Sequence, residues 1–501
     1  MPIRILYSLC LLITISSLIS AADWNQWRGS NRDGVAADSP ALISKLPETG
    51  LTPIWTANGI GSGKNDGGWG SPVVITKPAP EGSRRDTESL VYLFTHKRIK
   101  FRDVPKKKYP WLPPEKRVGM TPEQYAEYEV KRRDEDEFIA QSYRHIETVL
   151  CLDGHTGQER WKNERKSFYS RFPQSGSPTV VDGRLYILGA GRHARCINAA
   201  NGDDLWSVRL EGDFRDEFWQ SSFVIVDNLA IFLAGHLFAL DTKNGKVLWE
   251  GDAKLTRGTH TSPVLWKKDG KQFVVVNVNG SETICVEPAT GKELWRIKSE
   301  GGLSTPVIAG DRLLTYGNSR KKGLRSFQMT LEDAKHEWTF NGAADKGSSP
   351  VVVGDHVFVQ GEKRLACVDL ASGKACWQVT IDYRRPQYIS LIAADKKVYY
   401  ALEGLLCFNA SGESFEPLID GKIDDTGWLA TEAAIRKKLN LDKIEQEPNG
   451  QAKAEKLYQS KIGRHGPVPC VMPAFADGFL YVRLKNSVVC YDLRDRQQAA
   501  K

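Results

Sequence analysis

Eleven aromatic, cationic, amide or hydroxyl side chains stand just before short apolar runs of this 501-residue sequence. They are Trp69, Arg171, Gln174, Trp219, Gln220, His260, Thr261, Arg385, Gln387, Arg464 and His465. Arginines would donate charge-assisted hydrogen bonds to acidic groups, and tryptophans exposed beside arginine are typical binding anchors. If the fold gathers these residues, we predict a ring of side chains that binds an anionic or polar ligand. The alternative is a wet channel whose polar groups face only water.

Other chemical signals are weak. The run Gly59-Ile60-Gly61-Ser62-Gly63-Lys64 lacks the full spacing of a phosphate loop and is followed by no helical pattern, so it indicates a flexible loop. The nine histidines are scattered, with no pair at metal-ligand spacing, and we predict no metal site. No Gly-x-Ser-x-Gly elbow occurs, and no catalytic residue can be assigned.

A repeat supplies the elements that would position the eleven side chains. Asp, Gly and Trp recur with three residues between neighbours, in Asp153/Gly157/Trp161, Asp241/Gly245/Trp249 and Asp369/Gly373/Trp377. Variants with the same spacing are Asn198/Gly202/Trp206 and Glu287/Gly291/Trp295. A small residue, often followed by Pro, opens an apolar run before each copy. Four short strands in each unit of about 40–45 residues predict a β-propeller blade.

The number of units predicts an all-β, eight-bladed propeller. Its blades begin near Ser71, Ser177, Ser221, Ser262, Thr305, Ser349, Ser390 and Pro473. The last unit has only three strands, so we expect residues 53–56 near the N-terminus to supply its outer strand and close the ring.

The N-terminus predicts export. Arg4, an apolar run over residues 5–19, and the small residues Ser20 and Ala22 are typical of a signal peptide over residues 1–22, cleaved before Asp23. The run is too short to span a bilayer comfortably, so we expect the mature chain, 23–501, not to cross a membrane. The formal net charge of +8 is mild for this length, and nucleic acid is not an expected partner.

The repeats resemble those of the pyrroloquinoline-quinone-like (PQQ-like) propeller superfamily. Residues 239–249, Ala-Leu-Asp-Thr-Lys-Asn-Gly-Lys-Val-Leu-Trp, are similar to its tryptophan-docking motif, and residues 24–29 with Asp33-Gly34 resemble the start of many exported bacterial members. The resemblance implies that each tryptophan packs against the neighbouring blade and that the glycine allows a tight turn. The docking tryptophans would be Trp55, Trp161, Trp206, Trp249, Trp295, Trp338 and Trp377.

Two branches of this superfamily have different functions. Quinoprotein dehydrogenases hold PQQ and calcium in the central channel, whereas the BamB-like branch is non-catalytic. The sequence has no adjacent cysteines, no Cys-x-x-Cys-His haem motif and no convincing calcium-binding trio at matched blade positions. These departures favour the BamB-like branch, and we expect no cofactor.

Nine cysteines in an exported protein would ordinarily suggest disulfides. Six share one repeat position, two residues before the motif's acidic or turn residue: Cys151, Cys196, Cys285, Cys367, Cys407 and Cys490. Equivalent positions on successive blades lie roughly 10 Å apart, whereas a disulfide needs Cα atoms within about 7 Å. We expect six unpaired core thiols. Cys376 and Cys470 lie outside this position and would pair only if adjacent.

Two insertions interrupt the repeat, at about residues 95–147 and about residues 420–466. Thr121 is the expected cap of a helix that reaches about Tyr143, and further helices are expected over residues 431–439 and 452–458. The insertions are either partner-binding arms or solvated loop decoration.

Together these features predict a monomeric, non-catalytic binding or scaffold propeller in the periplasm or outside the cell. Its partner at the channel mouth would be an envelope protein, or a polar small molecule or polymer. Two alternatives stay open: a PQQ-dependent oxidoreductase, favoured by calcium ligands in the channel, and another propeller enzyme acting on a polymer, favoured by close carboxylates at the mouth.

Overall fold

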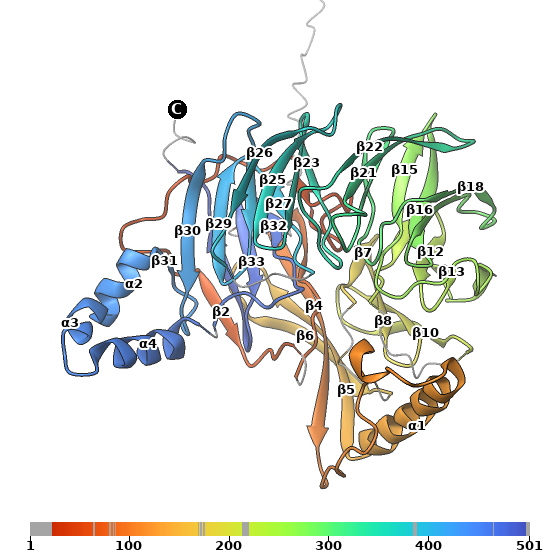
Figure 1. Cartoon of the computed structure of the whole chain (residues 1–501), viewed down its shortest axis with the longest axis horizontal. Helices are drawn as coiled ribbons and strands as arrows, with labels where there is room; N and C mark the ends of the chain where they lie inside the picture. The colour runs from red at the N-terminus through yellow and green to blue at the C-terminus, as the bar shows by residue number, and fades with distance from the viewer. Residues whose placement is uncertain are drawn as a thin grey trace, which may run out of the picture.

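The computed structural model describes residues 23–63, 66–79, 82–83, 85, 87–168, 170, 173, 176–212, 220–383, 388–463 and 465–496. Eight sheets stand side by side around a central axis (Figure 1), and seven of them have four antiparallel strands while one has six strands, of which one pair is parallel. The predicted eight-bladed, all-β propeller is therefore confirmed. The signal peptide predicted over residues 1–22 lies outside the described residues.

The first four blades follow the chain in order, each from its inner to its outer strand. Blade 1 consists of β3 (Val73–Pro78), β4 (Thr87–Lys100), β5 (Tyr143–Asp153) and β6 (Glu159–Lys166). Blade 2 consists of β7 (Thr179–Val181), β8 (Arg184–Gly189), β9 (His193–Asn198) and β10 (Asp204–Arg209). Blade 3 consists of β11 (Val224–Val226), β12 (Leu229–Leu233), β13 (Leu237–Asp241) and β14 (Val247–Glu250). Blade 4 consists of β15 (Val264–Lys268), β16 (Lys271–Val278), β17 (Glu282–Val286) and β18 (Glu293–Lys298).

Blades 5 and 6 also follow the chain in order, whereas blades 7 and 8 each include a strand from the N-terminal segment. Blade 5 consists of β19 (Val307–Ala309), β20 (Arg312–Tyr316), β21 (Leu324–Met329) and β22 (Ala334–Phe340). Blade 6 consists of β23 (Val351–Val353), β24 (His356–Gly361), β25 (Arg364–Asp369) and β26 (Ala375–Thr380). Blade 7 orders β1 (Val35–Ala36), β27 (Ile392–Ala394), β28 (Lys397–Tyr400), β29 (Gly404–Asn409), β30 (Pro417–Ile423) and β31 (Leu429–Ala430). Blade 8 orders β32 (Ala474–Ala476), β33 (Phe479–Arg483), β34 (Ser487–Asp492) and β2 (Trp55–Asn58).

All seven predicted docking tryptophans bridge neighbouring blades. Each indole Nε1 donates a hydrogen bond of 2.8–3.1 Å to a backbone carbonyl in the next blade. The motif glycine of the next blade lies against the ring: a Cβ at Gly157 would come within 2.5 Å of Trp55, and one at Gly202 within 2.6 Å of Trp161. The repeat glycine is therefore required both for its left-handed backbone and for close packing.

A β-bulge precedes each of the docking tryptophans on β6, β10, β14, β18, β22 and β26. In blade 1, for example, Cys151 pairs with Trp161 and Leu152 pairs with Glu159, so Arg160 is the extra residue. The cysteine position thus lies directly across the sheet from the docking ring. All six cysteines there are buried and none is in a disulfide, because no two of them share a blade.

The ring closes as the sequence predicts, by pairing of the two ends of the chain. Residues 55–58 form β2, which is antiparallel to β34, and Ile54 N donates to Cys490 O at 2.8 Å. Trp55 then donates from Nε1 to Gly154 O of blade 1 at 2.9 Å. No tryptophan docks blade 7 on blade 8, where Ile419 occupies the corresponding place. Leu42 and Leu46 are buried with Ile419 in one core cluster, so the N-terminal segment fills that junction.

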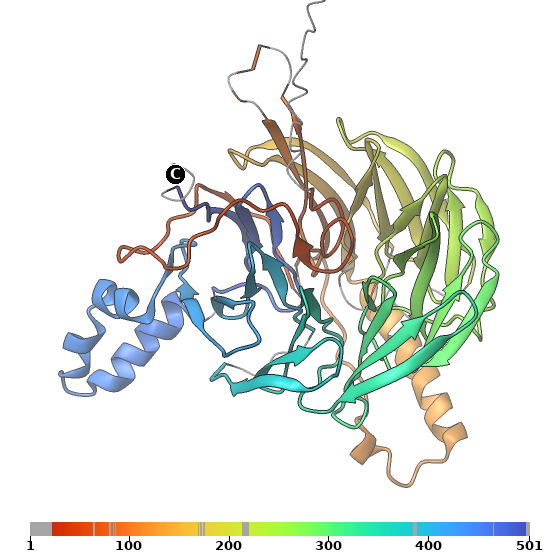
Figure 2. The same ribbon diagram turned by 90° about the horizontal axis from the view of Figure 1, so that it is seen from above.

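The two insertions project from the ring as helical arms (Figures 1 and 2). The first contains a 3₁₀-helix, η1 (Pro114–Lys116), and α1 (Pro122–Ala140), whose Thr121 cap and Gln124 form a capping box. Its ends continue β4 and β5 as one long hairpin. The second contains α2 (Glu432–Leu439), α3 (Leu441–Glu445) and α4 (Gly450–Lys461), of which α3 was not predicted. No helix among the described residues is long and apolar enough to cross a membrane.

The closure by Trp55 gives the first prediction. Replacing Trp55 with alanine removes a buried ring and leaves a cavity against Gly157, so the free energy of unfolding should fall by about 3–5 kcal/mol. Urea unfolding followed by circular dichroism measures this. Leu205→Ala, at an exposed outer-strand position, is the matched control and should cost less than about 0.5 kcal/mol. Equal effects of the two substitutions would contradict a closing role for Trp55.

Candidate functional site at the channel mouth

The propeller axis is filled by the N-terminal residues 24–36, which we call the plug. Figure 2 shows this segment entering the middle of the ring. Trp24 exchanges two backbone hydrogen bonds of 2.9 Å with Val74 on β3, and Val180 N on β7 donates to Asn25 O. At its other end, β1 pairs in parallel with β27. The plug therefore replaces an open channel with packed backbone and side chains.

Two buried arginines bind the plug to the segments before three more inner strands. Arg28 donates to the carbonyls of Ser349 and Pro350 before β23, at 3.3 and 2.5 Å. Arg32 donates to the carbonyls of Ser222 and Pro263 before β11 and β15, each at 3.1 Å. Burial lowers the pKa of Arg28 to about 10 and that of Arg32 to about 9, so both stay cationic at neutral pH. Carbonyls that converge from separate blades compensate these charges, and the Asp33 carboxylate adds a favourable electrostatic interaction at Arg28.

A belt of hydroxyl groups surrounds the mouth and explains the small residue that opens each blade. The backbone N–H of one blade donates to the serine or threonine hydroxyl of the next at 2.9–3.0 Å. These bonds are Met472 N to Ser71 Oγ, Ser71 N to Ser177 Oγ, Ser222 N to Ser262 Oγ, Ser262 N to Thr305 Oγ1, and Ser349 N to Ser390 Oγ. The belt sets the spacing of the loops that form the mouth.

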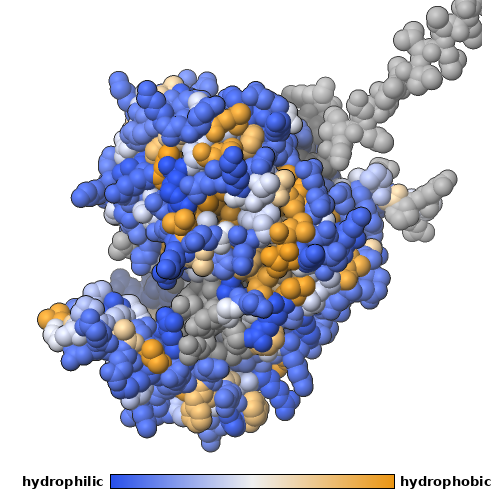
Figure 3. All heavy atoms as spheres, turned by 90° about the vertical axis from the view of Figure 1, so that its right-hand side faces the viewer, coloured by the Kyte–Doolittle hydropathy of each residue, from blue (hydrophilic) through white to orange (hydrophobic). Residues whose placement is uncertain are grey.

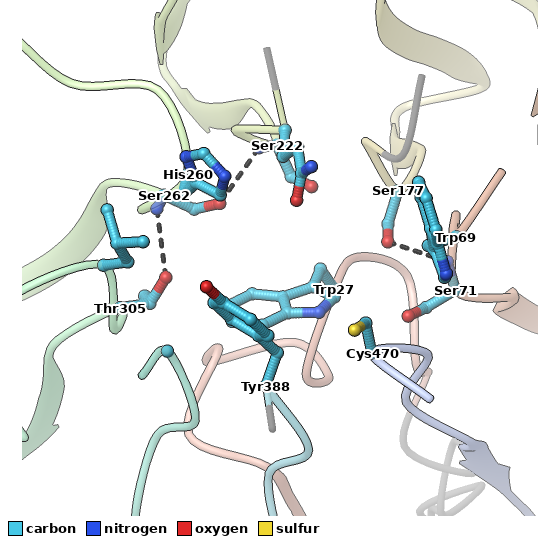
Figure 4. A pocket seen from close by; sticks show the side chains of 13 residues that line it. Trp27, Trp69, Ser71, Ser177, Ser222, His260, Ser262, Thr305, Tyr388 and Cys470 are labelled. Carbon is cyan, nitrogen blue, oxygen red and sulfur yellow. Dashed lines mark hydrogen bonds between the residues drawn. The ribbon is translucent and has the colours of Figure 1, made fainter. Parts of the chain in front are cut away.

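A cavity of about 290 Å³ lies above the plug, inside this belt (Figure 4). Its lining comes from all eight blades and the plug. The lining residues are Trp27, Trp69, Ser71, Ser177, Gln220, Ser222, His260, Ser262, Leu303, Thr305, Gly347, Tyr388 and Cys470. Trp27 of the plug and Tyr388 lie centrally in Figure 4, with Trp69 on one side and His260 on the other. All four rings are only partly buried, so they present aromatic surface to the cavity.

Tyr388 is held in place by a carboxylate outside the cavity. Asp345 Oδ1 accepts backbone hydrogen bonds from Gly347, Ser348 and Tyr388 at 3.0, 2.7 and 3.1 Å. A Cβ at Gly347 would come within 2.4 Å of the Tyr388 ring, so only glycine allows this approach. Asp345 therefore positions Tyr388, and its carboxylate is engaged by backbone N–H groups.

The described lining carries no ionised group. None of its residues is Asp, Glu, Lys or Arg. Burial lowers the pKa of His260 to about 4, which leaves the imidazole neutral at physiological pH. Burial raises the pKa of Cys470 to about 12, so its sulfur is a protonated thiol and a poor nucleophile. The close carboxylates that would favour a polymer-cleaving enzyme are not present in this lining.

A second cavity, of about 330 Å³, adjoins the first beside blades 4 and 5. It shares His260 and Leu303 with the mouth cavity and is lined also by Thr261 and Asn277. The buried hydroxyl of Thr261 has no hydrogen-bond partner among the described residues. His260, whose Nδ1 lies 2.7 Å from Thr259 Oγ1, thus stands between the two hollows.

The structure brings together four of the eleven predicted site residues: Trp69, Gln220, His260 and, in the second cavity, Thr261. His465 lines neither cavity; it follows α4, and its Nε2 lies 2.8 Å from Ser460 O. Arg171, Gln174, Trp219, Arg385, Gln387 and Arg464 lie outside the described residues. Cys376 and Cys470 are not partners, because Cys376 lies beside Cys367 on blade 6 whereas Cys470 lines the mouth.

Sequence reasoning missed Trp27, Leu303, Tyr388 and Cys470 as lining residues. Tyr388 could have been found by the rule that identified the others, because it stands just before the Ser390 belt residue. Trp27 could not, since nothing in the repeat places residues 24–36 on the axis. The plug belongs to no blade and is positioned only by tertiary contacts.

The fold and its docking tryptophans define an eight-bladed PQQ-repeat propeller with a filled axis. A family model described as "Outer membrane protein assembly factor BamB" matches residues 138–265 and 266–414, more than half of the sequence. The chain therefore belongs to the outer membrane protein assembly factor BamB family.

Curated relatives of that name match over part of the chain. BamB of Moranella endobia (strain PCIT) is 26% identical over 147 residues, and BamB of Yersinia pestis is 28% identical over 148 residues. Each match covers 28% of this chain and 34% of the relative, so the chain spans about a third of the length of these relatives.

Solved structures with a similar outline were also found. The BamB structure from Moraxella catarrhalis has a TM-score of 0.47 and 12% identity, and covers 70% of this chain and 89% of its own. The computationally designed Ika8 protein has a TM-score of 0.45 and 12% identity, and covers 70% of this chain and 93% of its own.

The neutral histidines predict acid sensitivity. Burial lowers the pKa of His260, His145 and His193 to about 4 and that of His96 to about 3, from an ordinary value of 6.5. The unfolded chain therefore binds more protons between these values, and stability present above pH 6.5 is lost as the pH falls towards 4. Melting temperatures measured from pH 7 to pH 4 should fall.

The contribution of His260 can be isolated by substitution. His260→Asn cannot ionise, so its melting temperature should fall less steeply with pH than that of the wild type. His336→Asn, at an exposed position, is the control and should keep the wild-type slope. A His260→Asn slope equal to that of the wild type would contradict burial of a neutral imidazole.

Proposed function

We propose that this protein is an exported, non-catalytic binding propeller that supports outer membrane protein assembly in the periplasm. Its mouth cavity would receive an aromatic or aliphatic side chain from an envelope protein. The observation that carries the proposal is a concave, uncharged lining with aromatic rings from the plug and two blades. The role in assembly is taken from the names of the family and its relatives.

The chemistry of the cavity supports binding over catalysis. A mostly apolar hollow with a few convergent hydroxyl and amide groups is typical of a binding pocket, and its volume suits one large side chain. Buried aromatic anchors carry most of the energy of protein interfaces. The described lining offers neither an ionised acid or base nor an activated nucleophile. An anionic ligand, as expected from the arginines before the inner strands, would have to engage Arg171, Arg385 or Arg464.

The proposal predicts which side chains hold the partner. The double substitution Trp69→Ala with Tyr388→Ala removes two aromatic anchors of the lining, one before blade 1 and one before blade 7. Tagged protein recovered from cross-linked envelopes should then retain at most about a tenth of the partner, because one anchor is typically worth about 2 kcal/mol. Quantitative mass spectrometry of the recovered proteins measures the loss.

A matched control separates the cavity from the general surface. Leu205→Ala with Leu248→Ala also removes two partly exposed apolar side chains, but from the outer strands of blades 2 and 3. It should leave recovery unchanged, and all variants should melt within a few degrees of the wild type. Full recovery with the Trp69 and Tyr388 variant would refute the cavity as the docking site and direct attention to the helical arms.

The expectation that no PQQ binds is supported by the filled axis. The plug fills the space that the quinone and calcium occupy in the dehydrogenase branch, and Arg28 and Arg32 would place two cations against a calcium ion. We therefore expect no PQQ uptake. Dialysis of the protein with PQQ and calcium, followed by absorption spectroscopy and a dye-linked alcohol assay, tests this. Stoichiometric uptake with turnover would restore the oxidoreductase alternative.

A further inference from the structure

Blade 6 contains a cluster of one imidazole and two thiols that the mouth cavity does not use. One ligand atom from each of His356, Cys367 and Cys376 lies within 4.8 Å of the other two. Cys367 is fully buried, whereas His356 and Cys376 are partly exposed, so the cluster is open to solvent on one side. We propose that these three residues form a zinc site.

The three residues come from three adjacent strands. His356 begins β24, Cys367 lies on β25, and Cys376 is the bulge residue of β26, next to the docking Trp377. Phe358 pairs with Cys367 across the sheet, and His356 points to the same face two residues earlier. The bulge turns Cys376 towards Cys367, because it sets two residues of β26 opposite one of β25.

The repeat itself shows that these three positions converge. In blade 5 they are occupied by Arg312, Ser326 and Glu337, and the Glu337 carboxylate accepts hydrogen bonds from Arg312 Nε at 2.9 Å and from Ser326 Oγ at 2.8 Å. In blade 2, Arg184 Nη1 lies 4.0 Å from Cys196 Sγ at the equivalent positions. The three positions are thus in contact in blade 5, and two of them are in contact in blade 2.

Blade 6 alone places metal-binding groups at all three positions. In each of the other seven blades, at most one of the three residues is a cysteine or histidine. A thiol across from the docking ring recurs in the repeat and needs no ligand. Blade 6 differs from the other blades in having a second thiol, Cys376, at the bulge and an imidazole, His356, on β24.

The neighbouring blade holds the imidazole in place. Gly412 lies in the turn that receives Trp377, and a Cβ there would come within 2.2 Å of His356 Nε2. Figure 1 shows β25 and β26 beside β29 and β30 of blade 7, so the cluster lies where the two blades meet. A metal ion would therefore join three strands of one blade at its contact with the next.

The donor set is typical of zinc. Two thiolates and one imidazole match the sulfur and nitrogen ligands of tetrahedral zinc sites, and the fourth position would hold water or an external ligand. On binding, Zn²⁺ forms two Zn–S bonds and one Zn–N bond while each thiol releases one proton, so two protons appear in solution for each metal ion bound. No oxidant or reductant takes part. The sequence alone predicted no metal site, because the ligands are far from the usual linear spacings.

Zinc binding by the intact mature protein tests the proposal. Reduced, metal-free protein should bind one equivalent of Zn²⁺ in competition with a chromophoric chelator, and Co²⁺ should give the thiolate charge-transfer and tetrahedral bands of an S₂N site. Cys376→Ser and His356→Gln should each weaken Zn²⁺ binding more than about tenfold. Substitution of residues that only hydrogen-bond to metal ligands already costs about tenfold or more, so loss of a ligand should cost at least this much. Neither substitution touches the mouth cavity, so failure here leaves the proposed function intact.

Matched controls keep the test specific. Cys285→Ser and His336→Gln change a cysteine and a histidine outside both the cluster and the mouth cavity and should bind Zn²⁺ as the wild type does. Thermal melting without metal identifies any variant that fails to fold, and the charge-transfer band of Co²⁺ should be lost in Cys376→Ser although the fold persists. No stoichiometric Zn²⁺ uptake, or uptake unchanged in the double variant Cys376→Ser with His356→Gln, would overturn the proposal. A Cys367–Cys376 disulfide in protein isolated from the envelope would also overturn it.

Discussion

A ring of eight sheets has no open edge only if its two ends pair, and here the N-terminal segment both closes the ring and fills its axis. Residues 24–36 fill the axis, Leu42 and Leu46 fill the junction that lacks a docking tryptophan, and β2 completes blade 8. An unpaired edge would expose backbone hydrogen-bonding groups, and an empty axis would leave the Ser and Pro carbonyls around it unsatisfied. The closure of the ring and the filling of its axis therefore both depend on this segment.

The candidate site is a consequence of the same segment. Trp27 of the plug lines the bottom of the cavity, and the hydroxyl belt holds the loops that surround the cavity. The guanidinium groups of Arg28 and Arg32 bind backbone carbonyls below the cavity. The plug therefore presents the Trp27 ring to the cavity, and not the charge of these arginines. The described lining is therefore suited to recognising shape and apolar surface, which is the basis of the proposed binding role.

Repetition also allows one blade to differ from the others without loss of the fold. The docking ring, the glycine and the bulge are the parts that packing requires, and they recur around the propeller. The residues at the bulge and on the second strand are free to vary, and they hold an ion pair in blade 5 and an imidazole and two thiols in blade 6. A new site can thus arise at a position whose geometry is already set by neighbouring blades.

The sequence by itself determined the number of blades, the docking tryptophans and the pairing that closes the ring, although the closing strand spans Trp55–Asn58 and not the expected residues 53–56. These follow from local rules of spacing and pairing that repeat along the chain. It also identified Trp69, Gln220 and His260, since residues before inner strands must approach the axis. Only the tertiary structure decided that residues 24–36 occupy that axis, that Tyr388 and Trp27 share a cavity with Trp69, and that His356 lies beside Cys367 and Cys376. These contacts join residues of different strands or blades, so no periodic sequence pattern predicts them. The plug occurs only once in the sequence, and the bulge changes the direction of a side chain through backbone geometry and not through sequence spacing.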